Sequence, residues 1–244
     1  MRIAYLDEGE GDPILLIHGF ASNKQVNWIY PGWVDLLVKD GRRVIAIDNR
    51  GHGDSQKFHD PADYGAPVMA EDARRVLDHL GIERADVMGY SMGARISAFL
   101  TLNHPDRVRR AVFSGLGYGM IEGVGDPEPI ATALEAERLQ DVSDRNGRAF
   151  RAFAEQTGSD RRALAACMRS SRQKNQRRGC RQNRAPGSGC RWNQGRYCRL
   201  AAEARRADPP HAEVLEIPGR DHMLAVGDKV HKQGVLAFLN NVDA

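Results

Sequence analysis

The sequence predicts an α/β protein with a mostly parallel, doubly wound sheet and a small helical cap. Three observations lead to this prediction. Short apolar runs alternate with helix-like segments, as expected of strands that are buried on both faces of a parallel sheet. Glycine-rich polar motifs directly follow several of these runs, at the strand ends where open α/β sheets build their sites. The 244 residues, 41% of them hydrophobic, suffice for one large core, so we expect a single domain over residues 1–244.

The first half of the chain supplies an edge strand and two buried strands. Residues 2–6 alternate polar and apolar side chains, which is typical of an edge strand. Residues 14–17 and 44–47 are apolar throughout and predict strands buried on both faces. Helical spacing with a glycine at the C-terminal end predicts helices over 33–41 and 70–80.

The second half continues the alternation of strands and helices. The expected elements are a strand ending at Tyr90, a helix over about 92–103, a strand over 108–114, a short strand within 212–219 and a last amphipathic helix over about 230–239. Between them, residues 117–165 are helical in pattern but polar, with several glycines and prolines at their start. This stretch is predicted to form a cap inserted over the sheet edge.

A serine stands at the end of one apolar run, within Gly89-Tyr90-Ser91-Met92-Gly93. Small residues on both sides of a serine suit a sharp turn from a strand into a helix, which exposes the hydroxyl. The following backbone amide and the helix N-terminus can then face developing negative charge. The motif alone is short, so its meaning depends on the rest of the chain.

Other polar motifs end the remaining apolar runs. His18-Gly19-Phe20 follows the first buried strand, a glycine-rich loop over 48–55 follows the second, and Gly219-Arg220-Asp221-His222 follows the last. By themselves, His18 and the acids and histidine of the 48–55 loop are interpreted as structural, because such loops are usually held together by internal hydrogen bonds.

Taken together in this order, the four motifs resemble the α/β-hydrolase superfamily, over residues 1–116 and 212–244. The resemblance implies a catalytic triad in which Ser91 is the nucleophile and His222 is its general base. It also implies that the backbone amides of Phe20 and Met92 form the oxyanion hole. An imidazole partner is what a serine hydroxyl needs, because the hydroxyl is a poor nucleophile at neutral pH.

The third member of such a triad is an acid that orients the histidine. The resemblance places it after the penultimate strand, within about 187–198, but the sequence has no apolar strand there, so this region of the sheet is expected to be disrupted. Asp208 and Glu203 are the remaining candidates, and each is more readily interpreted as a surface acid. The acid of the triad is therefore not identified from the sequence.

A strongly basic segment occupies this region instead. Twelve basic residues and one acid, Glu203, lie between Arg169 and Arg206, together with Cys180, Cys190 and Cys198. The cysteine spacings contain no C-x-x-C pair, so no zinc site is expected. The segment over about 174–209 is open to three hypotheses: a solvated face, a loop that binds an anionic partner such as nucleic acid, or a reading-frame shift.

The reading-frame hypothesis can be examined on the sequence. Reading each codon from Ala185 to Arg199 one nucleotide later permits Leu-Pro-Val-Leu-Val-Ala-Val-Gly-Thr-Lys-Asp-Asp-Ile-Ala-Gly. This is a buried strand followed by Gly-x-x-Asp-Asp, as the resemblance leads one to expect. In that register the acid falls near Gly195 or Arg196, neither of which can act as one, and the nucleotide sequence of the gene decides the matter.

The function expected from the sequence is that of a serine hydrolase of the carboxylesterase type (EC 3.1.1) that cleaves a carboxylic ester or similar small acyl substrate through an acyl-enzyme. Two alternatives stay open: a lactone or carbon–carbon bond hydrolase of the same fold, and an impaired or non-catalytic protein on this scaffold. No metal or cofactor and no nucleic-acid or membrane partner is expected, and the oligomeric state is left open. With no leader-like N-terminus and no apolar run near 18 residues, a cytoplasmic location is expected.

Overall fold

The structure is a computed structural model that describes residues 1–117, 119–172, 187–192 and 213–241. Its centre is a seven-stranded sheet with the order β1-β3-β2-β4-β5-β6-β7. Every neighbouring pair is parallel except β1 and β3, which confirms the predicted mostly parallel sheet. The strands are β1 (Tyr5–Glu8), β2 (Asp12–Ile17), β3 (Arg42–Ile47), β4 (Ala85–Tyr90), β5 (Val108–Ser114), β6 (Gly187–Trp192) and β7 (Glu213–Ile217).

Side chains of the central strands alternate between two apolar layers. In β2, Leu15 and Ile17 pack into one buried cluster, whereas Ile14 and Leu16 pack into the other. All four side chains are fully buried. This explains why the strand is apolar throughout: successive residues point to opposite faces, and each face is covered.

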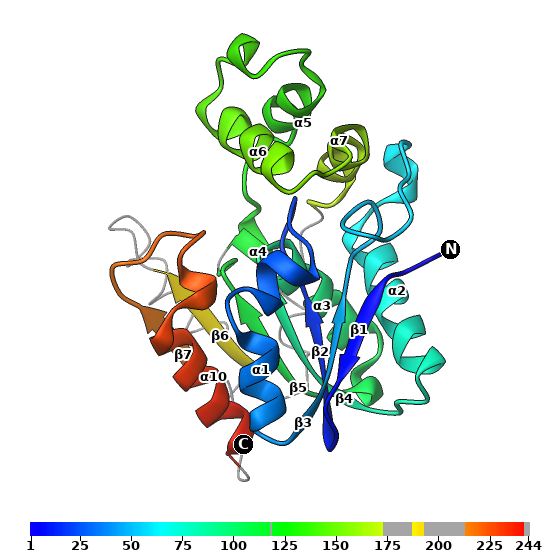
Figure 1. Cartoon of the computed structure of the whole chain (residues 1–244), viewed down its shortest axis with the longest axis vertical. Coiled ribbons are helices and arrows are strands. Elements are labelled where there is room, and N and C mark those ends of the chain that lie inside the picture. Colours follow the sequence, from blue (N-terminus) through cyan, green and yellow to red (C-terminus); the bar gives the residue numbers. More distant parts are fainter. Residues whose placement is uncertain (118, 173–186, 193–212, 242–244) are drawn as a thin grey trace.

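Helices cover both faces of the sheet (Figure 1). The apolar side chains of α1 and α10 join the cluster on one face, and those of α2 and α3 join the cluster on the other. The helices of this layer structure are α1 (Trp33–Lys39), α2 (Ala66–His79), α3 (Met92–Asn103) and α10 (Lys229–Asn240). The helix that was predicted over 70–80 therefore begins four residues earlier, at Ala66, where Pro67 occupies the first turn.

A group of helices lies beyond the carboxyl ends of the strands, as Figure 1 shows. These helices are α5 (Glu128–Glu135), α6 (Arg145–Gln156) and α7 (Arg161–Ser170), and the single turn α4 (Gly119–Glu122) precedes them in the chain. The side chains of Asp144 and Asp160 cap α6 and α7 by accepting backbone N–H bonds from Gly147 and Ala163. The helical insertion extends to Ser170, five residues beyond the limit of 165 expected for the cap.

Five short helices complete the connections. They are a single-turn π-helix, η1 (Gln25–Ile29), and the 3-10 turns η2 (Pro61–Asp63), η3 (Pro105–Arg107), η4 (Leu139–Asp141) and η5 (Ala225–Gly227). None of the helices in the described ranges is long and apolar enough to cross a membrane.

The penultimate strand, β6, is formed by residues without the apolar pattern of the other central strands. The backbone of β6 pairs in parallel with β5 on one side and with β7 on the other. A parallel ladder is made by backbone N–H and C=O groups, so a segment without an apolar pattern can still complete it. The rest of the basic segment, residues 174–186 and 193–209, lies outside the described residues, so the hypotheses about it stay hypotheses.

Candidate active site

The site forms where the strand order of the sheet changes direction. Strand β2 has β3 on one side and β4 on the other, so the loops that leave β2 and β4 diverge at neighbouring carboxyl ends. Such switch points are where open α/β sheets bind ligands. The loop at 18–22 follows β2, and Ser91 follows β4.

Ser91 occupies a strained turn between β4 and α3. Its φ of 55° and ψ of −112° are rare for a residue with a side chain. The turn is held by the amide of Ser91, which donates to the carbonyl of Ser114 at 2.8 Å. A strained serine at the point where a strand becomes a helix is a feature of nucleophile elbows.

Glycines on both sides of Ser91 allow the turn to pack tightly. A Cβ atom on Gly93 would lie 1.9 Å from the carbonyl oxygen of Ile17, and one on Gly89 would lie 2.2 Å from the carbonyl oxygen of Gly93. These neighbours are backbone atoms that cannot move aside cheaply. The Gly-x-Ser-x-Gly spacing is therefore a steric requirement for bringing α3 against β2.

His222 reaches Ser91 from the loop that follows β7, the last strand of the sheet. It lies in the turn after β7, and its Nε2 is 3.0 Å from Ser91 Oγ. Asp221 shapes this turn, because its carboxylate accepts the amides of Met223 and Leu224 at 2.9 and 2.8 Å. The structure thus brings together the two residues to which the sequence resemblance gave the roles of nucleophile and base.

The electrostatic surroundings keep His222 neutral. Burial lowers its pKa below 6.5, and the nearby charge of Asp221 opposes this shift only in part. A neutral imidazole whose proton is on Nδ1 can accept the proton of the serine hydroxyl through Nε2.

Tyr90, directly before the serine, positions the histidine turn. Its hydroxyl donates to the carbonyl oxygen of His222 at 2.6 Å, and the two rings lie 5.3 Å apart. The Tyr90 ring also packs against Gly115, where a Cβ atom would lie 2.9 Å from the ring. The strand that presents the serine therefore also fixes the residue that faces it.

Two backbone amides near Ser91 are available for hydrogen bonding. Met92 begins α3, where the first amides of a helix have no intrahelical partner. Phe20 follows Gly19, whose Cβ position would lie 3.4 Å from Ser91 Cβ. Within the described ranges, neither the Phe20 amide nor the Met92 amide has a hydrogen-bond acceptor.

Asn27, in η1, fixes the loop that carries Phe20. Its Oδ1 accepts the amide of Gly19 at 3.0 Å, and the side chain is 5% exposed. The Nδ2 of Asn27 has no hydrogen-bond partner in the part of the chain that the structure describes. This leaves a buried amide donor near Gly19 and Ser91 that is free to contact a bound molecule.

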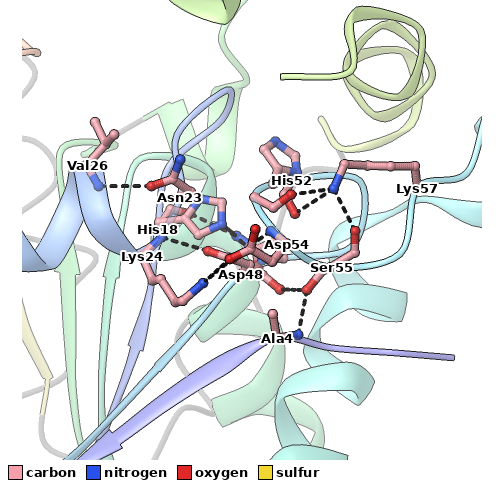
Figure 2. A network of polar contacts seen from close by, with 12 residues as sticks. Ala4, His18, Asn23, Lys24, Val26, Asp48, His52, Asp54, Ser55 and Lys57 are labelled. Atoms are coloured by element: carbon pink, nitrogen blue, oxygen red, sulfur yellow. Dashed lines mark hydrogen bonds and ion pairs between the residues drawn. The ribbon is translucent and has the colours of Figure 1, made fainter. Parts of the chain in front are cut away.

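A polar network ties together the loops that follow β2 and β3 (Figure 2). At its centre, the fully buried Asp48 accepts the Lys24 ammonium at 2.7 Å and the amides of Lys24 and Asp54 at 2.8 and 2.9 Å. Burial alone would raise the pKa of Asp48, but the influence of His18 and of these donors lowers it. Asp48 therefore stays ionised and anchors both loops.

The two buried histidines of this region, His18 and His52, make contacts that support the loops. His18 Nε2 accepts the amide of Asn49 at 2.9 Å, and Nδ1 lies 2.7 Å from the Gly19 carbonyl oxygen, which fixes the tautomer. Burial lowers the pKa of His52 to about 3, so it is also neutral, and its ring packs edge-on against Phe20. Both rings support the loop that carries Phe20.

The other predicted site residues fall elsewhere. Glu203 and Asp208, the candidates for the triad acid, lie outside the described residues, as do Gly195 and Arg196. Across the parts of the chain that the structure describes, no group of three or more His, Cys, Asp or Glu side chains is arranged to hold a metal ion.

Sequence reasoning missed Tyr90 and Asn27. Tyr90 occupies an ordinary strand position and Asn27 lies in a short π-helix, which has no periodic pattern to reveal it. Tyr90 contacts His222, about 130 residues further along the chain, and this contact has no signal in the sequence. Asn27 contacts Gly19, 8 residues away, which is close enough in sequence for a contact to be suspected.

A serine at a strand-to-helix elbow, faced by a histidine that follows the last strand of a parallel sheet, defines the architecture of α/β serine hydrolases. The sequence comparison identifies the broader fold family that contains this architecture. The model of the alpha/beta hydrolase fold family matches residues 12–172, so the chain belongs to this family.

Individual relatives differ in their named activities. A 2-hydroxymuconate semialdehyde hydrolase of Pseudomonas putida is 39% identical over 131 residues, which cover 53% of this chain and 42% of that protein. A soluble epoxide hydrolase of Corynebacterium sp. (strain C12) is 31% identical over 133 residues, which cover 54% and 44%. The chain thus spans less than half the length of these curated relatives.

Solved structures resemble the whole chain. The enol-lactonase from Burkholderia xenovorans LB400 has a TM-score of 0.78 at 21% identity, covering 97% of this chain and 96% of its own. A bromoperoxidase from Bacillus anthracis has a TM-score of 0.78 at 24% identity, covering 97% and 95%. At this level of identity the likeness concerns the fold alone.

The ion pair between Lys24 and Asp48, at the centre of Figure 2, should contribute to the stability of the fold. Replacing Asp48 by Ala leaves the amides of Lys24 and Asp54 without their acceptor and leaves the Lys24 ammonium with Asp54 as its remaining partner, so we expect the unfolding free energy to fall by about 2 kcal/mol. Urea denaturation measures the change. Asp35→Ala, at an exposed position of α1, is the matched control, and equal stability of the two variants would contradict the proposed anchoring role.

Proposed function

We propose that this protein is a serine hydrolase that cleaves small carboxylic esters through an acyl-enzyme on Ser91. The observation that carries the proposal is the 3.0 Å distance between Ser91 Oγ and His222 Nε2. This is hydrogen-bonding distance, so the imidazole can take the hydroxyl proton as the oxygen attacks.

The reaction proceeds in two stages. Ser91 Oγ adds to the acyl carbon while its proton passes to His222 Nε2, and the protonated imidazole then gives that proton to the leaving alcohol. Water, deprotonated by His222, then attacks the acyl-serine and releases the acid. The stages balance, because the water supplies one proton to regenerate Ser91 and its oxygen to the carboxylate.

The amides of Phe20 and Met92 are proposed to stabilise the oxyanion in both stages. Both lack an acceptor within the described residues, and both lie at the turn that holds Ser91 or beside it. Amide donors that are fixed in advance stabilise the negative charge without reorganising, which is commonly the largest contribution to catalysis at such sites. The Phe20 amide is kept in place by Asn27, His18 and the network around Asp48.

A carbon–carbon bond hydrolase is the second candidate, and a specific observation favours it. The relatives from Pseudomonas putida and Pseudomonas sp. (strain CF600), 39% and 38% identical over their matched parts, are named for hydrolysis of 2-hydroxymuconate semialdehyde. That compound contains no ester, so its hydrolysis breaks a carbon–carbon bond. Incubation of the purified protein with this substrate and with p-nitrophenyl esters separates the two candidates.

Removing the proposed nucleophile should abolish turnover. We expect Ser91→Ala to lower kcat for p-nitrophenyl esters by at least about 10³-fold, because the acyl-enzyme can no longer form. Release of p-nitrophenol measures the effect. Ser143→Ala, at an exposed position outside the site, should retain full activity.

Covalent labelling distinguishes a working site from an inactive scaffold. A fluorophosphonate probe should label the wild-type protein at Ser91 and leave the Ser91→Ala variant unlabelled. A wild-type protein that neither reacts with the probe nor hydrolyses any ester would refute the proposal and favour a non-catalytic role.

The acid limb of the pH profile should reflect His222. Only the neutral imidazole can accept the serine proton, and burial lowers the pKa of His222 below 6.5. We therefore expect kcat/KM to rise with pH through a midpoint below 6.5 and to stay high at neutral pH. A pH–rate profile with p-nitrophenyl acetate tests this, and a midpoint above 6.5 would be the contrary result.

The hydrogen bond from Tyr90 should matter for catalysis. Tyr90→Phe removes its donor to the His222 carbonyl oxygen, worth about 1 kcal/mol, so we expect kcat to fall roughly five-fold. Tyr30→Phe, at a side chain that is 75% exposed, is the control. If both variants match the wild type, the proposed positioning role is wrong.

A further inference from the structure

Four arginines are buried in the part of the chain that the structure describes, and one of them differs from the rest. Arg42, Arg50 and Arg151 each form an ion pair with a carboxylate, within 2.9 Å in every case. Arg95 is equally buried, at 2% exposure, but no carboxylate pairs with it. Burying a guanidinium without a counter-charge is costly, so its retention calls for a reason.

The hydrogen bonds of Arg95 leave donors unused. Its Nη2 donates to the carbonyl oxygen of Gly119 at 2.9 Å, whereas the fully buried Nε has no partner among the described residues. Burial and the positive charge of Arg172 lower the pKa of Arg95 to about 10, so it stays charged at neutral pH. The site is thus a buried cation with hydrogen-bonding capacity to spare.

Arg95 lies close to the proposed nucleophile. It belongs to the first turn of α3, and its backbone amide donates to the carbonyl oxygen of Ser91 at 3.3 Å. Met92, in the same turn, contacts the cap, where its sulfur lies 3.9 Å from Cys167 Sγ in α7. Arg95 is therefore at the junction between the elbow and the cap.

A second arginine is held by the same short turn of the chain. Arg172, which follows α7, donates to the carbonyl oxygens of Val124, Gly125 and Asp126 at 3.3, 2.9 and 3.0 Å. Gly119 and Val124 are themselves neighbours, because a Cβ atom on Gly119 would lie 2.7 Å from a Val124 methyl group. Both guanidinium groups thus converge on residues 119–126.

We propose that Arg95, assisted by Arg172, binds a carboxylate group of the substrate, so that the preferred substrates are acyl compounds carrying a negative charge remote from the scissile bond. This rests on the proposed function of Ser91. A carboxylate would accept from the unused donors of Arg95 and supply the counter-charge that the buried guanidinium lacks among the described residues. Chloride or phosphate could also neutralise the charge of Arg95, but neither ion carries an acyl group that Ser91 could attack.

Two esters that differ only at the far end of the acyl chain test the proposal. The p-nitrophenyl monoester of glutaric acid ends in a carboxylate, and p-nitrophenyl valerate ends in a methyl group at the same length. We expect the wild type to prefer the glutarate monoester by about 10- to 100-fold in kcat/KM, mostly through KM. Arg95→Gln should lower this preference by a similar factor, and Arg95→Lys, which keeps the charge, should retain part of it.

Control variants separate recognition from folding. Arg75→Gln, at an exposed position of α2, should keep the full preference. Arg172→Gln, a less buried site, should weaken the preference, and it serves as the deciding variant if thermal unfolding shows that Arg95→Gln is not folded. An unchanged preference in the folded variants would overturn the proposal.

The outcomes for the wild type distinguish this proposal from the proposed function. Equal hydrolysis of the two esters, with fluorophosphonate labelling of Ser91, would overturn only the carboxylate site. Failure to hydrolyse either ester, together with absent labelling, would refute the hydrolase assignment on which it rests. Glutarate should also inhibit valerate ester hydrolysis competitively, whereas inhibition by chloride or phosphate alone, at equal ionic strength, would contradict recognition of an organic carboxylate.

Discussion

The close approach of α3 to the end of β2 is the constraint on which the site depends. Gly93 leaves no room for a side chain against the backbone of Ile17, and two residues earlier the chain turns through the strained conformation of Ser91. Backbone strain of this kind costs about 1–3 kcal/mol, so interactions with the surrounding structure have to hold Ser91 in this conformation. The hydrogen bond from the Ser91 amide to Ser114, on the neighbouring strand, is one of the interactions that do so.

The same constraint explains why the neighbouring loops are so rigidly held. The loop after β2 carries the proposed oxyanion donor Phe20, so it has to be held as firmly as the turn at Ser91. A displacement of the donor by about 1 Å relative to the serine would be costly to catalysis. Asp48, fully buried and ionised, ties that loop to the one after β3, and Asn27 holds the Gly19 amide. On the opposite side, Tyr90 fixes the His222 turn. Each support reaches the site from a separate element.

Much of the fold was predictable from the sequence because both faces of the sheet are covered. Buried parallel strands need continuous apolar runs, so 14–17 and 44–47 identified strands directly. Strand β6 was not predictable in this way, because its ladder is formed by backbone groups and leaves no apolar pattern to find. The pairing of Ser91 with His222 was expected from the family resemblance. Tyr90, Asn27 and Arg95 instead act through single hydrogen bonds to residues of other segments, which hydrophobic periodicity does not reveal.

Charge at the site is divided between groups that are kept neutral and groups that are kept ionised. Burial keeps His222 and His52 neutral, whereas Asp48 stays charged because a lysine and two amides surround it. Arg95 is charged and buried, and although its Nη2 donates to the Gly119 carbonyl oxygen, no carboxylate among the described residues pairs with it. The other buried arginines of the described residues are paired with carboxylates. Under the proposal made for Arg95, the carboxylate of the substrate would supply the missing counter-charge, and substrate charge would become part of the electrostatic balance of the site.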